Sequence, residues 1–197
     1  MELLLIRHAR PHHVTDPSGA ADPDLNDAGH YQGSRLGAAV AAGRYGRVDR
    51  LVSSPMRRAV QTAEYVRQSL DLDLAVNERL VELNHGWPEY GLAEDAYTDR
   101  RALIADMNAG RIAHRTFDPV AFRARVVAGI DDLVDDTDTV TAVVCHGGVI
   151  NAYLSHALDT SSMFFTDPFY TSVSRIRADP DGFRQVLSLN EIDHLRD

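Results

Sequence analysis

Short, continuous apolar runs that end in basic or glycine-rich residues constrain the fold of this chain more than any other feature. The run Leu3–Ile6 is followed at once by Arg7, and the valine-rich stretch Thr139–Cys145 is followed by a histidine and two glycines. Runs of this length are typical of strands that are buried on both faces of a sheet. They alternate here with segments of helical periodicity, which indicates an α/β fold with a mainly parallel sheet.

The remaining elements follow from the same patterns. We expect strands at residues 2–6, 48–53, 73–76 and 139–145, and a hairpin formed by 172–177 and 183–189 with its turn at 179–182. We expect helices at about residues 26–43, 56–70, 94–108, 121–134 and 147–158, the first of them capped by Asn26. Residues 10–24 form a polar loop in this scheme. No linker is long enough to divide the chain, so we expect a single domain, 1–197, with a cap-like insertion at about 84–119.

The charged residues exclude several classes of function. The chain has 29 acidic and 20 basic residues, a formal charge of −9, which argues against a general nucleic-acid binder. Every basic residue is an arginine, so a P-loop and a Schiff-base lysine are both excluded. Arginine instead offers a planar fork of donors that suits carboxylates and phosphates.

The single cysteine and the apolar start bear on the cellular compartment. Cys145 has no second cysteine to pair with, which is compatible with a reducing environment. The run before Arg7 is too short for a signal peptide or a membrane helix. We therefore expect a cytoplasmic protein without a membrane partner.

Three predicted strands lead directly into residues that could bind an anion. Their successors are Arg7-His8, Ser53-Ser54-Pro55 with Arg57-Arg58, and His146-Gly147-Gly148. In parallel α/β sheets, ligands bind beyond the carboxyl ends of the strands, so these residues are expected to meet in one positive pocket. A phosphoryl group fits such a pocket, and a neutral histidine there could attack phosphorus. Neighbouring arginines keep a histidine neutral because like charge lowers its pKa, and a carboxyl group could protonate the departing alcohol.

Five ordered blocks resemble the histidine phosphatase superfamily, which includes the cofactor-dependent phosphoglycerate mutases. The blocks are Leu5–Ala9, Leu25-Asn26 with Gly29 and Gln32, Ser53–Glu64, Leu80–Leu83 with Gly86-Trp87, and Val144–Ile150. The resemblance covers roughly residues 2–152, and five blocks in order are far more specific than one Arg-His pair. It implies a three-layer α/β/α sandwich around a mainly parallel central sheet.

The resemblance also implies roles for individual residues. His8 would be the phosphorylated nucleophile, with Arg7, Arg58 and His146 holding the phosphate of a small phosphorylated substrate. Glu82 would be the proton donor and later the base, with His146 also counted among the catalytic residues. No metal and no cofactor are implied. Ala9 and Pro11 stand where the family usually has glycine and threonine or asparagine, and neither Arg10 nor Arg57 receives a role.

Alternative functions remain open at this point. We favour a metal-independent phosphatase that works through phosphohistidine. The alternatives are a cofactor-dependent phosphoglycerate mutase and a non-catalytic module that binds a phosphorylated ligand. The mutases' substrate segment has no clear match between Asn84 and Arg101, although Arg100-Arg101 imitates part of it.

Several residues keep a second interpretation. Glu78 and Glu89 are rivals of Glu82 for the acid. A metal cluster of His12, His13 and Asp16 with His8 is disfavoured, because adjacent histidines project differently. Cys145 does not fit a cysteine phosphatase, since position 151 is asparagine where an arginine would be needed. Three aromatic residues could line the mouth of the pocket or pack within the cap: Trp87, Tyr90 and Tyr97. Three phenylalanines could form a homodimer interface or belong to the core: Phe164, Phe165 and Phe169.

Overall fold

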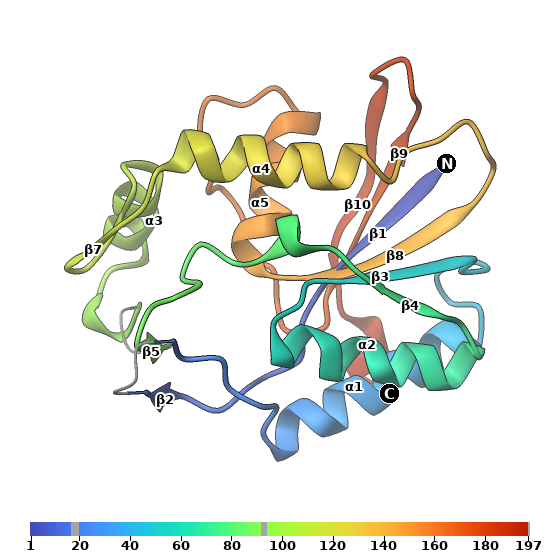
Figure 1. The fold of residues 1–197 in the computed structure, drawn as a ribbon, viewed down its shortest axis with the longest axis horizontal. Coiled ribbons are helices and arrows are strands. Elements are labelled where there is room, and N and C mark those ends of the chain that lie inside the picture. Colours follow the sequence, from blue (N-terminus) through green and yellow to red (C-terminus); the bar gives the residue numbers. More distant parts are fainter. Residues whose placement is uncertain (17–19, 92–93, 197) are drawn as a thin grey trace.

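The computed structural model describes residues 1–16, 20–91 and 94–196, and its fold is a three-layer α/β/α sandwich (Figure 1). A six-stranded sheet in the order β10-β9-β1-β8-β3-β4 forms the middle layer. The four strands β1 (Glu2–Arg7), β8 (Val140–Cys145), β3 (Arg50–Ser53) and β4 (Leu74–Val76) pair in parallel. The hairpin of β9 (Val173–Ala178) and β10 (Arg184–Glu191) adds antiparallel strands beside β1. The predicted fold class is confirmed.

Helices cover both faces of the sheet, which explains the continuous apolar run at β1. α1 (Asp27–Ala41) and α2 (Arg57–Leu70) lie on one face, and α4 (Pro119–Asp131) and α5 (Gly147–Ala157) lie on the other (Figure 1). Successive side chains of a strand point to opposite faces. Leu3 and Leu5 accordingly pack in the cluster with α4 and α5, while Leu4 and Ile6 pack with α1 and α2.

The segment at 84–119 is built from short pieces. These are β5 (Glu89–Tyr90), η2 (Glu94–Ala96), α3 (Arg100–Asn108), β6 (Arg111–Ile112) and β7 (Arg115–Thr116). The single helix expected at 94–108 is wrong, because Asp99 caps a new helix by accepting a hydrogen bond from the Arg101 backbone N–H. β5 also pairs with β2 (Val14–Thr15), so the loop at 10–24 contains a strand that the sequence did not predict. The division into domains stays a prediction.

Other boundaries shift by a few residues for local reasons. α4 begins at Pro119 and not at Ala121, because Asp118 accepts hydrogen bonds from the Val120 and Ala121 backbone N–H groups. Single turns of 3₁₀ helix, η1 (Glu78–Leu80) and η3 (Asp193–Leu195), were not expected. The turn expected at 179–182 is confirmed, with Gly182 at φ +96° between β9 and β10.

No helix within the described ranges has both the length and the apolar character that crossing a bilayer requires.

Candidate active site

The three strand ends meet at one edge of the sheet, as the sequence predicted. In the register of the sheet, Arg7 lies opposite Cys145, and Ser53 lies opposite Val144. The residue after β1 is His8 and the residue after β8 is His146, and their ring centroids lie 5.1 Å apart. Residues far apart in the chain therefore share one site.

His8 is buried and its tautomer follows from its contacts. Its Nδ1 lies 2.8 Å from the carbonyl oxygen of Ala9, so Nδ1 carries the proton and donates it. Its Nε2 then has a free lone pair, which accepts a hydrogen bond from the Nε–H of Arg58 at 3.3 Å. Burial, followed by the charges of Arg58 and Arg7, holds the pKa of His8 well below its ordinary 6.5. The imidazole is therefore neutral at neutral pH.

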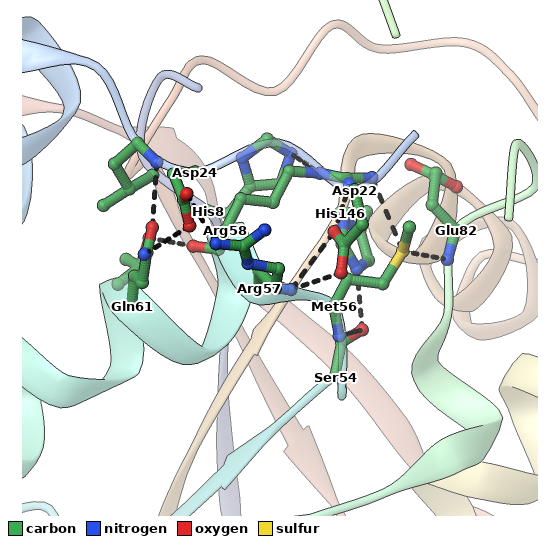
Figure 2. A network of polar contacts seen from close by, with 12 residues as sticks. His8, Asp22, Asp24, Ser54, Met56, Arg57, Arg58, Gln61, Glu82 and His146 are labelled. Carbon is green, nitrogen blue, oxygen red and sulfur yellow. Dashed lines mark hydrogen bonds and ion pairs between the residues drawn. The ribbon is translucent and has the colours of Figure 1, made fainter. Parts of the chain in front are cut away.

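Arg58 is fully buried and is fixed on three sides (Figure 2). Besides its contact with His8, its Nη1 lies 3.2 Å from a carboxylate oxygen of Asp22. Its guanidinium carbon lies 4.6 Å from the ring centroid of Tyr90, a cation–π contact. α2 begins at Arg57, so the first turn of that helix carries Arg58 into the site.

Arg7 approaches His8 from the end of β1. It donates a hydrogen bond to the carbonyl oxygen of Pro168 at 2.5 Å, and its guanidinium carbon lies 4.2 Å from the ring centroid of Tyr170. Its Nε is buried, and within the described part of the chain it has no hydrogen-bond partner. A buried, unpaired N–H donor beside a second arginine is a place for an anion.

His146 presents a second unpaired nitrogen. Its Nε2 lies 2.7 Å from the hydroxyl oxygen of Ser54, which itself accepts from the backbone N–H of Met56 at 3.4 Å. A proton donated by the hydroxyl to Nε2 leaves Nδ1–H as the free donor of His146. That Nδ1 is buried, with no partner among the residues described. Burial, then the charge of Arg58, lowers the pKa of His146 well below 6.5.

The carboxylate of Glu82 lies at the N-terminus of α5. Its oxygens accept hydrogen bonds from the backbone N–H of Gly148 at 2.8 Å and from its neighbour Leu83 at 2.9 Å. Burial raises the pKa of Glu82 and outweighs these bonds and the charges of the two arginines. Gly148 leaves the room for this contact, because a Cβ there would lie 2.2 Å from Oε1 of Glu82.

One cavity of about 390 Å³ is lined by Arg7, His8, Arg58, Glu82 and Gly148. His146 is not among the described lining residues, although its neighbour Gly147 is. The cavity has a neutral imidazole with a free lone pair, two guanidinium groups and a carboxyl group with a raised pKa. Such a set can hold an oxyanion, attack an electrophile and transfer a proton.

A comparison with known families identifies the group to which this site belongs. The family described as the histidine phosphatase superfamily (branch 1) matches residues 3–191. The chain belongs to this superfamily. The resemblance drawn from the sequence is therefore confirmed, and the family indicates an enzyme of the phosphatase or mutase type.

Relatives with sequence similarity are longer than this chain. The chain is 32% identical over 203 residues to Bifunctional protein Rv2228c of Mycobacterium tuberculosis, an alignment that covers 98% of this chain and 54% of that protein. The chain thus spans about half the length of this curated relative and of two others that it matches equally well.

Two solved structures share the fold over nearly their whole length. A phosphoserine phosphatase from Entamoeba histolytica, in complex with 3-phosphoglyceric acid, has a TM-score of 0.75 at 16% identity and covers 98% of each chain. A phosphoglycerate mutase from Bacillus anthracis also has a TM-score of 0.75, at 21% identity, covering 100% of this chain and 95% of that one. At these identities the likeness shows the fold alone.

The superfamily's second block holds the loop that follows His8. Gly29 has no side chain, and a Cβ there would lie 2.0 Å from the carbonyl oxygen of Arg10. Gln32 accepts a hydrogen bond from the Arg10 backbone N–H at 2.9 Å. Thr62 in α2 accepts from the Ala9 N–H and donates to the Arg58 carbonyl. Helices α1 and α2 thereby fix the backbone that carries the nucleophile candidate.

The structure separates Glu82 from its rivals. Glu89 forms a salt bridge with Arg115 at 2.9 Å, and neither Glu78 nor Glu89 is among the described residues that line the cavity. Arg57 is 60% exposed and pairs with Asp24 at 2.6 Å, outside the same lining.

The remaining candidates divide between the site and the packing around it. Tyr90, Phe164 and Phe169 line the cavity, and Phe164 is almost completely buried. Tyr97 instead donates a hydrogen bond to Asp106 in α3, and both Tyr97 and Trp87 pack against Leu103 and Ile112. In the part of the chain that the structure describes, no group of three or more histidine, cysteine or acidic side chains could hold a metal, His12, His13 and Asp16 included.

Cys145 is fully buried, and burial raises the pKa of its thiol. It is thus poorly suited to act as a nucleophile.

Two residues of the site, Asp22 and Tyr170, have no signal in the sequence, and a third, Ser54, has only an indirect one. Asp22 lies in a loop, Tyr170 lies between α5 and β9, and Ser54 was part of a recognised block without an assigned contact. A loop aspartate or tyrosine resembles any exposed polar residue until the tertiary fold sets it against an arginine. Only the block around Ser54 could have suggested that hydroxyl.

Proposed function

We propose that the protein hydrolyses phosphomonoesters through a phosphohistidine formed on His8. The observation that supports this most directly is the unprotonated Nε2 of a buried, neutral imidazole that lies beside Arg58 in the cavity. A phosphoryl group that takes over the Arg58 N–H would release this lone pair for attack. Imidazole is nucleophilic only in its neutral form, and the two arginines that lower its pKa also attract a phosphoryl group.

The reaction then takes two steps. Nε2 of His8 attacks phosphorus, and the P–O bond to the alcohol breaks as protonated Glu82 donates its proton to the departing oxygen. Glu82, now ionised, takes a proton from water, which attacks phosphorus and breaks the P–N bond. Phosphate leaves and His8 is neutral again. In both steps Arg7, Arg58 and the Nδ1–H of His146 would bind the phosphoryl oxygens.

The raised pKa of Glu82 supports its two roles. A carboxyl group must carry a proton to serve as an acid, and burial favours that form. Once the proton is given away, the Gly148 N–H and the N-terminus of α5 stabilise the carboxylate.

We further propose that no metal takes part, because the guanidinium groups of Arg7 and Arg58 already supply positive charge to the phosphate. Phosphatase activity should therefore be equal before and after dialysis against a chelator. A loss that added divalent metal restores would contradict this part of the proposal.

The deciding experiment traps the covalent intermediate. The protein is mixed with a phosphomonoester carrying a radiolabelled phosphate and is quenched in alkaline detergent, because phosphohistidine survives base and decays in acid. Label is expected on the wild-type protein, to be absent from His8→Ala, and to be retained by His12→Ala, a matched change in the exposed loop. Label on His8→Ala would overturn the assignment.

The same preparation distinguishes the alternatives. Arg100, which imitates part of the mutase substrate segment, is paired with Asp167, and this favours hydrolysis over phosphoryl transfer. Released phosphate is expected in excess over isomerised phosphoglycerate, with and without bisphosphoglycerate. Phosphate binding without turnover would instead favour the non-catalytic module.

A further inference from the structure

The cavity extends beyond the phosphate-binding residues into an apolar compartment. Its far wall is formed by side chains from α3, β6 and adjoining segments: Leu83, Leu103, Ile104, Met107, Ile112 and Phe164. Leu103 and Ile112 are almost completely buried. Because this wall lies in the same cavity as His8, the alcohol part of a substrate would pack against it.

The charges of this compartment do not suit a second anion. Arg100 lies in the lining but already pairs with Asp167, which lies there too. The other carboxylate of the compartment, Asp95, lies 3.8 Å from the imidazole of His13. Apart from Arg7, Arg58 and Glu82 beside His8, the described lining thus offers one guanidinium against two carboxylates, and a carboxylated leaving group would meet net repulsion there.

Asn84 adds a hydrogen-bonding requirement. This residue lines the cavity, and only 8% of its surface is exposed. Its Oδ1 is buried, and the described residues provide no donor to it. Leaving a buried acceptor unpaired is unfavourable, so a ligand that donates a hydrogen bond to Oδ1 is favoured.

We infer that the preferred substrate is a phosphomonoester whose leaving group is uncharged, largely apolar and equipped with one hydrogen-bond donor. This inference rests on the proposed phosphatase function. Phosphorylated hydroxy acids, whose leaving groups carry a carboxylate, are poor substrates. The cavity of about 390 Å³ is near the lower end of ligand pockets, which suits a leaving group about the size of a substituted benzene ring.

Matched substrates test the inference. The first pair is para-hydroxymethylphenyl phosphate and para-carboxyphenyl phosphate, which share an aromatic body and differ in charge. We expect kcat/KM to be at least about tenfold higher for the hydroxymethyl ester. Para-methylphenyl phosphate, which has no donor, should fall between the two. In Asn84→Leu, kcat/KM for the methyl ester should equal that for the hydroxymethyl ester, because the acceptor for the hydroxyl group has been removed.

The charge argument has its own variants. Asp167→Asn releases Arg100, so the preference for the hydroxymethyl ester should fall about threefold or more, a modest change because both partners are more than half exposed. The preference should return in the double variant Asp167→Asn/Arg100→Gln. Asp132→Asn is the matched control, because Asp132 pairs with Arg79 outside the cavity lining and its loss should leave the preference unchanged.

The outcomes separate this inference from the function beneath it. Equal efficiencies, or a preference for the carboxylated ester, would overturn the inference and leave the phosphatase intact. No phosphate released from any of the three esters, with no label on His8, would overturn the proposed function and this inference with it.

Discussion

At the scale of single residues, the carbonyl oxygen of Ala9 decides how His8 can react. By accepting the Nδ1–H it fixes the tautomer, and Nε2 is left as the only nitrogen with a free lone pair. Arg58 then lies 3.3 Å from that nitrogen, where it also repels a proton. Without the Ala9 contact the proton could lie on Nε2, and that nitrogen could not attack.

The opposite pKa shifts of His8 and Glu82 predict a bell-shaped dependence of kcat/KM on pH. His8 must be neutral, and its lowered pKa means that activity is lost only as pH falls well below about 6.5. Glu82 must be protonated, and its raised pKa means that activity is lost as pH rises through a value above 4.5. The alkaline limb should disappear in Glu82→Gln, because glutamine does not titrate. The substrate's own titration is common to both proteins, so an unchanged alkaline limb in the variant would rule out Glu82 as the acid.

Glu82→Gln should also discriminate between leaving groups. An alkyl phosphate needs protonation of its departing oxygen, so kcat should fall about 10²–10³-fold, within the usual contribution of a general acid. With para-nitrophenyl phosphate the leaving group, para-nitrophenolate, departs without a proton. The rate of the phosphorylation step should therefore fall much less with this substrate. Glu78→Gln and Glu89→Gln are the controls, because both residues lie outside the described cavity lining. An equal loss in either control would move the acid role there.

At the scale of elements, the contact between α5 and Glu82 depends on one glycine. In Gly148→Ala the new Cβ would lie 2.2 Å from Oε1, so the carboxylate must leave the helix N-terminus. We expect kcat for an alkyl phosphate to fall at least about tenfold in Gly148→Ala. The same change made in a Glu82→Gln background is the control, and there it should alter kcat little because the acid is already missing. An equal loss in the two backgrounds would contradict this role of Gly148.

The elements that sequence could predict are those whose signal is local. The run at β1, the N-cap Asn26 and the arginines at the start of α2 each act through neighbours in the chain, and the carboxyl-end rule then brought the site together. The two-residue strands β2 and β5 are too short to show a period, and each exists only because the other lies beside it. Tyr170 could not be predicted as a site residue for the same reason, since its position against Arg7 depends on a tertiary contact.

At the scale of the whole molecule, a buried histidine near the C-terminus ties η3 to the site. The two ring nitrogens of His194 bond the hydroxyl groups of Tyr45 at 2.7 Å and Thr171 at 3.0 Å. The backbone N–H of Thr171 in turn donates to the carbonyl oxygen of Arg7 at 3.0 Å. Packing of η3 therefore supports the loop that carries Tyr170.

This histidine predicts a loss of stability in acid. Burial, followed by the charges of Arg44 and Arg35, lowers the pKa of His194 to about 4 in the folded state. His194 binds a proton more tightly in the unfolded chain than in the folded protein. Its contribution to the free energy of unfolding is therefore complete above about pH 6.5 and is lost as pH falls toward 4. The free energy of unfolding should drop on the order of 2 kcal/mol from this group over that interval.

Urea unfolding of wild type and His194→Leu at several pH values measures this contribution. The variant should be less stable at neutral pH, because two hydroxyl groups lose their partner, and the difference should narrow in acid. Other buried histidines titrate equally in both proteins, so the comparison isolates His194. A constant difference across the pH range would contradict the lowered pKa.

The pairing of β1 has a consequence for how the protein is made. Glu2 lies opposite Val140 on one side and Arg177 on the other, so β1 leaves the ribosome long before the strands with which it pairs. Such distant pairings raise the contact order and slow folding. His8 is likewise synthesised long before β8, yet the histidine, the arginines and the acid cannot be aligned until β8 has emerged. A nascent chain stalled before Val140 would carry His8 but remain inert toward cellular phosphate esters, and its apolar β1 would be a natural target for chaperones.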